Sequence, residues 1–465
     1  MALAMSKISH FWHLNLKKNL QKMFKRTIIN DLLAWKKSPA HKPLILSGAR
    51  QVGKTWVLKE FGRLNFDDTA YFSLDKDKSV KQLFATTRDP HRLIEQLSYI
   101  HGSKIEPQKT LVIFDEIQEC SDALQSLKYF CEDAPQYAVV CAGSLLGVYL
   151  NHSGQSFPVG KVDHLNMYPL TFSEFLEARD HNAYRYYCDI NSIEPIPDFF
   201  FDKLSENFTS YRICGGMPEA ANELITNGIN NVDKILSNIL KDYSSDFVKH
   251  TSPATANKID QIWKSVPSQL AKENKKFVYQ LVRTGARARE YEDALIWIER
   301  AGLIYRVNSV NKIALPIKAY DDLSSFKIYC LDQGILRMLA EMDTSVYTSE
   351  APGFAEFKGA LAENYILQSL VAQYEKTLRY WTSGNTAEID FILNIGNEII
   401  PIEVKADTNT VGKSLIEYQK KYNPRIRIRY SMKNLNLNGN LLHIPLFMAD
   451  KTQTLLNIIL NTPTA

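Results

Sequence analysis

Eight residues near position 50 have the types and the spacing of a phosphate-binding loop. The segment Gly48–Thr55 has the sequence GARQVGKT, and it lies between an apolar run at 42–47 and a helix-like pattern at 56–61. A loop between a buried strand and a helix start turns successive backbone N–H groups toward one point, where they bind phosphate oxygens. The sequence therefore predicts a nucleoside triphosphate site made by Gly48, Ala49, Arg50, Gln51, Val52, Gly53, Lys54 and Thr55.

Two side chains of this loop have separate predicted roles. Lys54 is expected to reach the β- and γ-phosphates of ATP, and the Thr55 hydroxyl is expected to bind Mg²⁺. Gly48 and Gly53 permit backbone angles and approach distances that a side chain would obstruct. A glycine-rich turn without function is disfavoured, because all the motif residues have the required spacing and context. ATP and Mg²⁺ are thus the predicted ligands.

A pair of acidic residues ends a second predicted strand. Residues 111–114 are apolar, and Asp115 and Glu116 follow them directly, at the strand end where α/β sheets place ligands. Asp115 is expected to hold Mg²⁺ through water, and Glu116 is expected to act as the general base on the attacking water. Two solvent-facing charges are the alternative. Gln118 is expected either to orient that water or to be a surface residue.

Two further strands are expected in the same sheet, at 69–75 and 137–144. The second of them ends at Ser144, next to the phosphate-binding loop. Ser144 is therefore a candidate catalytic residue that senses the γ-phosphate, and a small residue that only forms the strand-to-helix turn is the alternative. Together these segments predict an α/β core.

Five motifs spread over the chain share one family resemblance. They are GARQVGKT at 48–55, FDEIQ at 114–118, AGS at 142–144, YPLTFSEF at 168–175 and CGGMPE at 214–219. Together they resemble the prokaryotic AAA-like ATP-binding proteins, which carry an AAA domain followed by a C-terminal DUF4143-type domain. The resemblance implies an additional-strand (AAA/ASCE-type) P-loop NTPase core, a helical lid and a winged-helix-like module. Trp56 departs from the pattern, because many relatives have a second threonine there.

The predicted organisation has five parts. They are a basic N-terminal leader at 1–40, a P-loop ATPase core at 41–170, a helical lid at 171–265, a winged-helix-like module at 266–342 and an endonuclease-like domain at 343–465. The leader carries eight lysines and arginines against one aspartate, which favours a solvated surface helix over an arm that contacts DNA or lipid. The pair Gly215 and Gly216 is interpreted as a hinge of the lid or as an ordinary helix–helix turn.

Three arginines mark the winged-helix-like module. Arg283, Arg287 and Arg289 precede a predicted helix and strand. They are expected on a solvated helix face, or in contact with phosphate or with the ATP of a neighbouring subunit.

Four charged residues near the C-terminus form a second candidate site. A predicted helix carries Glu363, and a predicted β-hairpin at 388–406 carries Asp390, Glu403 and Lys405. Strand side chains repeat every two residues, so Glu403 and Lys405 share a face. The set resembles the restriction-endonuclease-like PD-(D/E)xK superfamily, although Ile-Asp replaces the leading Pro-Asp. The resemblance implies carboxylates that bind Mg²⁺ and a lysine that positions water.

The activity of this C-terminal domain has open alternatives. The same fold also serves as a binding module without cleavage activity, and a charged hairpin edge is a further alternative. Downstream, residues 425–430 alternate arginine with apolar residues, which predicts a strand with a basic face. That face suits a nucleic-acid backbone, or it is a solvated edge that discourages aggregation.

The composition is that of an ordinary globular protein. The 465 residues are 45% hydrophobic and 23% charged with a net charge of +4, which excludes a fibrous or disordered chain and a histone-like polycation. The six cysteines form no CxxC pair, which is typical of a reducing compartment. No apolar run approaches the roughly 18–20 residues that span a bilayer. A cytoplasmic protein without a membrane partner is expected.

Two functions are compatible with these features. The first is an Mg²⁺-dependent ATPase coupled to a nuclease-like C-terminal domain that acts on DNA. The second is a nucleotide-dependent regulatory switch whose C-terminal domain only binds a partner. A homo-oligomer is compatible with both. They differ at Glu116 and at Glu403 with Lys405, because hydrolysis is slow in the second and only the first requires strand cleavage.

Overall fold

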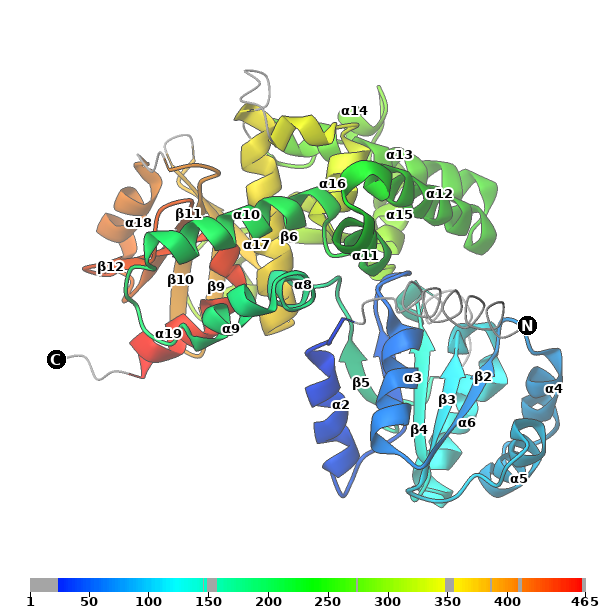
Figure 1. Ribbon diagram of the computed structural model, residues 1–465. Coiled ribbons are helices and arrows are strands. Elements are labelled where there is room, and N and C mark those ends of the chain that lie inside the picture. Colours follow the sequence, from blue (N-terminus) through cyan, green and yellow to red (C-terminus); the bar gives the residue numbers. More distant parts are fainter. Residues whose placement is uncertain are drawn as a thin grey trace, which may run out of the picture.

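The computed structural model describes residues 24–144, 146–148, 157–272, 275–347, 355–384, 387–408 and 412–461. Residues 1–23 of the predicted leader and residues 348–354 beside the predicted domain boundary lie outside these ranges. Figure 1 shows an N-terminal α/β unit in blue and cyan, a C-terminal α/β unit in yellow to red, and the green helices of the middle of the chain. Within the described ranges, no helix is long and apolar enough to cross a membrane.

The N-terminal unit is a five-stranded parallel sheet with the order β2-β3-β4-β1-β5. In this order β4 lies between β1, which precedes the phosphate-binding loop, and β3, which ends at Asp115. Its strands are β1 (Leu44–Ser47), β2 (Asp68–Ser73), β3 (Thr110–Asp115), β4 (Ala138–Gly143) and β5 (Asp163–Asn166). Its helices are α2 (Ile28–Lys37), α3 (Lys54–Asn65), α4 (Lys78–Thr86), α5 (Pro90–His101), η1 (Ile117–Glu119) and α6 (Ser121–Asp133).

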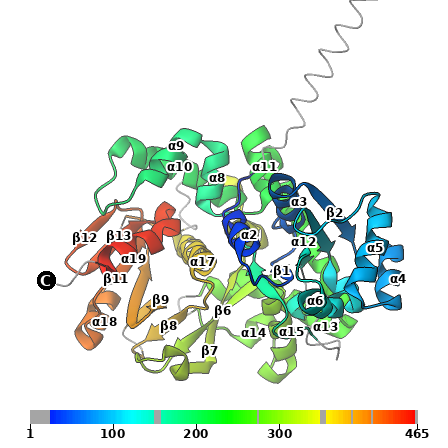
Figure 2. The same cartoon turned by 90° about the horizontal axis from the view of Figure 1, so that it is seen from below.

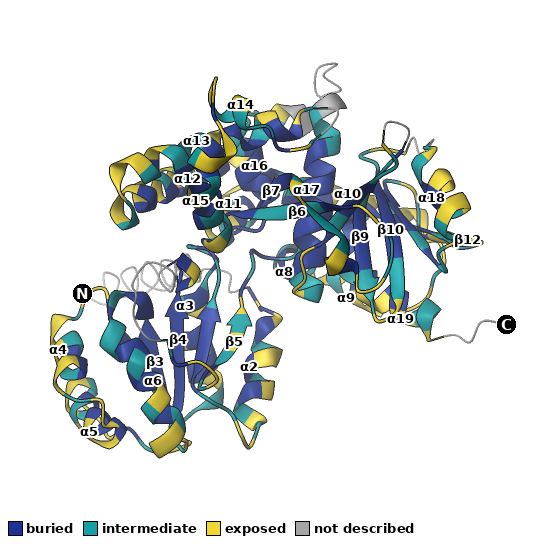
Figure 3. Ribbon diagram, turned by 180° about the vertical axis from the view of Figure 1, so that it is seen from behind, coloured by how far each residue is buried: buried dark blue, intermediate teal, exposed yellow. Residues whose placement is uncertain are grey.

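Alternate side chains of the central strands face opposite sides of this sheet. Leu44 and Leu46 of β1 pack in the same core as Val57 and Phe61 of α3, whereas Ile45 packs in the core beneath α4, α5 and α6. A strand covered on both faces needs apolar residues at every position. This requirement explains the apolar runs at 44–46 and 111–114. Figure 3 shows these strands buried and the outer faces of α4 and α5 exposed.

The middle of the chain is helical, as predicted for 171–265. Its elements are α8 (Phe172–Arg179), α9 (His181–Asp189), α10 (Asp198–Cys214), α11 (Pro218–Asn227), η2 (Ile229–Asn231), α12 (Val232–His250), α13 (Pro253–Leu270), α14 (Tyr279–Val282), α15 (Ala288–Arg300) and α16 (Gln333–Leu339). Apolar residues of these helices share one continuous core with β1 and α3. The helices are therefore packed on the N-terminal sheet rather than separate from it.

The two glycines between α10 and α11 form a tight joint. Gly215 has a φ of 67°, and a Cβ atom there would lie 2.1 Å from a carboxylate oxygen of Asp332. A Cβ at Gly216 would lie 2.4 Å from the carbonyl oxygen of Leu170, and the Gly216 N–H donates to Asp332 Oδ2 at 2.6 Å. The buried Arg337 adds a hydrogen bond to the carbonyl at the end of α10. These contacts favour a fixed helix–helix turn over a free hinge.

The C-terminal unit contains an eight-stranded mixed sheet with the order β12-β13-β11-β10-β9-β8-β6-β7. Its strands are β6 (Ile304–Val310), β7 (Asp321–Cys330), β8 (Arg379–Thr382), β9 (Glu388–Ile395), β10 (Glu398–Val404), β11 (Arg427–Ser431), β12 (Asn436–Asn438) and β13 (Leu441–Pro445). Its helices are η3 (Ile317–Tyr320), η4 (Thr344–Tyr347), α17 (Ala355–Tyr374), α18 (Ser414–Tyr422), η6 (Leu446–Lys451) and α19 (Thr452–Leu460). Figure 2 shows α17 between the C-terminal elements and α2.

Two features of this sheet differ from the expectations. The β6–β7 hairpin, predicted within the module at 266–342, pairs in parallel with β8 through Asn308 and Arg379, so it extends the C-terminal sheet. A hairpin edge with free N–H and C=O groups gains hydrogen bonds by this pairing. The predicted basic strand is β11, which lies between β10 and β13. The expectation of a solvated edge there is wrong.

Candidate functional site

The phosphate-binding loop joins β1 to α3, and Lys54 is the first residue of the helix. Its side chain is buried, and Nζ donates hydrogen bonds to the carbonyl oxygens of Gly48 at 2.9 Å and Ala49 at 2.8 Å. Burial lowers the pKa of Lys54 to about 8, although Glu116 and Asp115 oppose the shift. The ammonium group is thus held inside the loop by its own backbone, in the place where a phosphate oxygen would accept its hydrogen bonds.

The two glycines of the loop are required by its shape. Gly53 has a φ of 99°, in the left-handed region that favours glycine. Gly48 has a φ of 148°, and a Cβ there would lie 2.2 Å from the carbonyl oxygen of Met167, which follows β5. The first glycine of the motif is therefore required because the end of β5 packs directly against the loop.

The hydroxyl of the loop and the carboxylate of β3 meet directly. Thr55 Oγ1 donates to Asp115 Oδ2 at 2.8 Å, although the two residues lie 60 positions apart. Tyr71 of β2 donates its hydroxyl to the same oxygen at 2.8 Å, and burial and this hydrogen bond raise the pKa of Tyr71. A hydroxyl and a carboxylate in contact supply the hard oxygen ligands that Mg²⁺ prefers.

The next carboxylate is held in a fixed orientation. Glu116 has a φ of 53°, which turns its side chain at the end of β3. Its Oε2 accepts a hydrogen bond from Gln118 Nε2 at 2.6 Å and one from Ser144 Oγ at 3.1 Å. The structure therefore brings together Lys54, Thr55, Asp115, Glu116 and Ser144, as the sequence predicted, and it places Gln118 with them rather than on the surface.

The outer side of the loop contacts α12 of the helical region. Arg50 forms an ion pair with Asp246, Gln51 donates to Asp242 at 2.7 Å, and the Tyr243 hydroxyl donates to the Arg50 carbonyl oxygen at 3.0 Å. A cavity of 340 Å³ adjoins the loop on another side, lined among others by Gly48, Ala49, Ser144, Arg300 and Tyr305. The loop thus lies between the sheet and the middle of the chain.

Several residues of this environment were missing from the sequence predictions. Tyr71 lies in the predicted strand 69–75, and the parallel pairing of β2 with β3 brings it beside Asp115. The sequence gives the strand but not which strand it pairs with, so Tyr71 had no distinguishing signal. The acidic residues of α12 are likewise about 190 positions from their partners in the loop. The arginines Arg283, Arg287 and Arg289 are exposed, as expected for a solvated face.

The C-terminal candidate residues divide into two ion-paired groups. Glu363 of α17 is buried, it pairs with Lys275 at 2.5 Å, and it accepts a hydrogen bond from the Tyr329 hydroxyl at 3.0 Å. Burial opposes ionisation of Glu363, but Lys275 and Lys327 outweigh it and lower the pKa. Burial and then the Glu363 charge raise the pKa of the neighbouring Asp390 to about 7.

The second group surrounds Glu403 on β10. Its Oε2 accepts a hydrogen bond from Arg429 Nε at 2.7 Å, and its Oε1 lies 3.5 Å from Lys405 Nζ. Asp390 accepts a hydrogen bond from the Val404 N–H at 2.7 Å, which confirms the predicted neighbouring strands. Lysine and arginine side chains thus pair with Glu363 and Glu403, whereas Asp390 is hydrogen-bonded to a backbone N–H. Among the described residues, no three acidic, histidine or cysteine side chains are arranged to hold a metal ion, either in this group or around Asp115.

Three domain families match successive parts of the chain. An AAA domain matches residues 40–176, a domain of unknown function (DUF8612) matches residues 205–346, and a domain of unknown function (DUF4143) matches residues 358–447. The second match spans most of the helical region and the β6–β7 hairpin together. A comparison with curated proteins gives no match.

Several solved structures show detectable similarity to this chain at low sequence identity. The ORC2 protein of Aeropyrum pernix in its ADPNP–ADP complexes is 11% identical with a TM-score of 0.35, over 70% of this chain and 96% of that one. The Thermotoga maritima RuvB Holliday junction branch migration motor is 13% identical with a TM-score of 0.30, over 61% and 90%. PCH-2 of C. elegans is 13% identical with a TM-score of 0.28, over 44% of this chain and 63% of its own length.

Proposed function

We propose that this chain, which combines an AAA domain with a C-terminal DUF4143 domain, is an Mg²⁺-dependent ATPase that works as a nucleotide-controlled binding protein. The observation that carries the proposal is the 2.8 Å contact between Thr55 Oγ1 and Asp115 Oδ2. It joins the phosphate-binding motif to the acidic strand end in one site. Two unrelated charged segments would not be expected to place a hydroxyl and a carboxylate in contact beside the buried Lys54.

The residues around this contact have distinct proposed roles. Lys54 and the loop N–H groups bind the triphosphate, and Thr55 and Asp115 would hold Mg²⁺, which neutralises phosphate charge when bound. Glu116 accepts a proton as a water oxygen bonds to the γ-phosphorus and the bond from that phosphorus to the β,γ-bridging oxygen breaks. The products are ADP and inorganic phosphate. Ser144 holds Glu116 in place through its 3.1 Å hydrogen bond.

For the C-terminal domain we favour binding over cleavage. Metal-dependent phosphodiester cleavage needs carboxylates that are free to coordinate a cation, and Glu363 and Glu403 are already paired with Lys275 and Arg429. The resemblance to nucleases then concerns only the fold of this domain, and the same fold occurs in proteins with other functions. The partner is proposed to be DNA or a protein, and an effect of DNA on ATP turnover would separate the two.

The test combines two assays on the same full-length protein. ATP turnover is measured with and without DNA, and strand cleavage is measured on the same sample with Mg²⁺ and with Mn²⁺. We expect ATP turnover that requires a divalent cation, and no strand cleavage. Cleavage by the wild-type protein that disappears in Lys405→Ala would contradict the proposed role of the C-terminal domain. Absence of ATP turnover under all conditions would contradict the ATPase proposal.

A further inference from the structure

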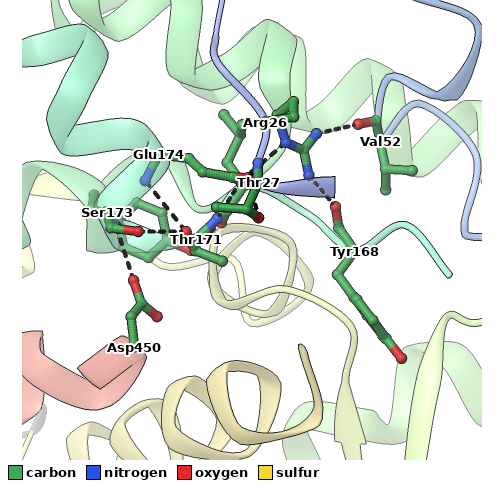
Figure 4. Close-up of polar contacts among 10 residues, drawn as sticks. Arg26, Thr27, Val52, Tyr168, Thr171, Ser173, Glu174 and Asp450 are labelled. Carbon is green, nitrogen blue, oxygen red and sulfur yellow. Dashed lines mark hydrogen bonds and ion pairs between the residues drawn. The ribbon is translucent and has the colours of Figure 1, made fainter. Parts of the chain in front are cut away.

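A buried arginine that precedes α2 donates a hydrogen bond to a backbone carbonyl oxygen of the phosphate-binding loop. Arg26 lies in the segment that the sequence predicted to be a solvated leader, but its side chain is only 5% exposed. Nη1 donates to the carbonyl oxygen of Val52 at 2.9 Å, Nη2 to that of Tyr168 at 2.6 Å, and Nε to Glu174 Oε2 at 3.0 Å. Figure 4 shows the guanidinium group between these three acceptors.

Glu174 extends this contact into α8. Its Oε1 accepts hydrogen bonds from the N–H of Thr27 at 2.7 Å and from the Thr27 hydroxyl at 2.9 Å. With Thr171 it also forms a reciprocal capping box at the start of α8. Both oxygens of this buried carboxylate are therefore engaged, and the first turn of α8 is fixed to the segment that carries Arg26.

A residue of the C-terminal unit binds the same helix start. Asp450 of η6 accepts a hydrogen bond from the Ser173 N–H at 2.8 Å, and this contact is visible in Figure 4. Gln373 of α17 donates to the carbonyl oxygen of Ala449 at 2.8 Å, next to Asp450 in the chain. A continuous series of polar contacts thus runs from the loop carbonyl of Val52 to the C-terminal unit.

Val52, the loop residue that Arg26 contacts, lies within the predicted phosphate-binding segment. Val52 lies directly before Gly53 and Lys54, inside the loop whose N–H groups would surround phosphate. If phosphate binding turns the peptide group of Val52, the carbonyl oxygen that accepts from Arg26 moves with it. The planar guanidinium group keeps this hydrogen bond only within narrow limits of angle and distance. Arg26 and Glu174 also line a cavity of 440 Å³ together with Trp56, two residues after Lys54.

We infer that Arg26 is a positioning residue that holds the phosphate-binding loop through Val52, and that Glu174 and Asp450 link the state of the loop to the docking of η6 on α8. The inference rests on the proposed ATP site. It requires that nucleotide affinity and the η6 contact change together, because coupling between two binding equilibria is reciprocal. A residue far from the phosphates, Asp450, then influences their binding.

The first experiment measures nucleotide affinity and turnover in Arg26→Lys, Arg26→Ala and Asp450→Ala. The control is Lys25→Ala, which removes a neighbouring cation that is itself exposed and pairs with Glu177 of α8. Arg26→Lys keeps the charge beside Glu174 but replaces the planar five-donor guanidinium group with a compact ammonium group, which does not reproduce the same three hydrogen-bond directions. We expect Kd and KM for ATP to rise about tenfold in both Arg26 variants and about threefold in Asp450→Ala. The kcat at saturating ATP should stay within about twofold of wild type in all of them.

The second experiment distinguishes coupling from simple structural support. Hydrogen exchange is measured at residues 446–451 and in α8, with saturating ADP and without nucleotide. In the wild-type protein and in Lys25→Ala we expect nucleotide to increase protection of both segments. In Arg26→Lys the segments should be folded, but the difference caused by nucleotide should disappear even at saturation.

The outcomes separate this inference from the proposed function. If Lys54→Ala binds ATP as well as wild type, the ATP site itself is misassigned. If Lys54→Ala loses binding, but Arg26→Lys and Asp450→Ala behave like Lys25→Ala in both experiments, the ATP site stands and the role of Arg26 is refuted. If Arg26→Ala does not fold, Arg26→Lys and Asp450→Ala still decide the question.

Discussion

Two acidic groups in this chain, one in each α/β unit, contain the same residue types but have different partners. Asp115 and Glu116 accept hydrogen bonds from neutral hydroxyl and amide groups. Glu363 and Glu403 form buried ion pairs with lysine and arginine. Carboxylates with neutral donors keep charge available for an external cation, whereas those of the second group are neutralised within the protein. The comparison teaches that carboxylates of the same type can have neutral donors in one unit and cationic partners in the other.

The largest expected effect is the loss of ATP binding in Lys54→Ala. The buried ammonium is the cation nearest the predicted phosphate position, so we expect kcat/KM for ATP to fall more than about 10³-fold. Binding of a fluorescent ATP analogue and a phosphate-release assay measure the two parts of this effect. Lys78→Ala, an exposed residue at the start of α4, is the control. Normal turnover in Lys54→Ala would show that the group around Asp115 and Glu116 is not the site of ATP hydrolysis.

The second effect concerns the base. Glu116→Gln keeps the hydrogen-bonding shape but cannot accept a proton, so we expect ATP binding within about threefold of wild type and a kcat about 10²–10³-fold lower. Glu119→Gln, three residues further on and paired with Lys249, should keep the wild-type rate. Pre-steady-state measurement of bound ATP and free phosphate checks both. Hydrolysis at the wild-type rate in Glu116→Gln would show that another group activates water.

The third effect tests the C-terminal group through stability. Arg429→Met leaves Glu403 buried without its main partner, and we expect the free energy of unfolding to fall by about 3 kcal/mol. Replacing both residues, Arg429→Met with Glu403→Leu, should restore most of the loss. Arg427→Met is the control, because Arg427 bonds the neutral amide of Asn440. Urea unfolding of the three variants measures the differences. A double variant as unstable as the single one would mean that Glu403 is required for another reason.

The smallest effect is a pH dependence of nucleotide binding. The pKa of Lys54 in the free protein is about 8, because burial lowers it, and phosphate binding favours the charged form. Affinity should therefore be nearly constant below pH 7 and fall about tenfold between pH 7 and pH 9 as the ammonium loses its proton. An ordinary lysine would show almost no change over this range. Tyr71 does not titrate there, because its pKa is raised. Isothermal titration calorimetry with ADP at several pH values measures the slope.

Much of the ATP site could be predicted because its chemistry is local in the sequence. The loop, the strand before it and the acidic pair each occupy a few consecutive residues, and their strands β1, β2, β3 and β4 were all expected from apolar runs. The short edge strand β5 (Asp163–Asn166) was missed, because its residues DHLN carry one apolar side chain. An edge strand covered on one side does not need the continuous apolar pattern.

The C-terminal site shows why the remainder could not be predicted. The sequence placed Glu403 and Lys405 on one face of a strand, and the two side chains do approach each other. It gave no signal that Arg429, on a strand that pairs in parallel with β10, would bind Glu403, or that Lys275 would reach Glu363 from 88 positions away. Spacing identifies residues along one element, but the cations that neutralise them come from elements whose pairing only the folded chain determines.

The joint at Gly215 and Gly216 limits how this protein can be divided for study. Asp332 and Arg337, from the far side of the β6–β7 hairpin, complete the end of α10, and Arg337 also bonds the carbonyl oxygen of Met342. A fragment cut after α15, before the β6–β7 hairpin, would leave that helix end without the contacts of Asp332 and Arg337. The shortest piece that we expect to be soluble and competent for nucleotide therefore runs from Phe24 to at least Met342.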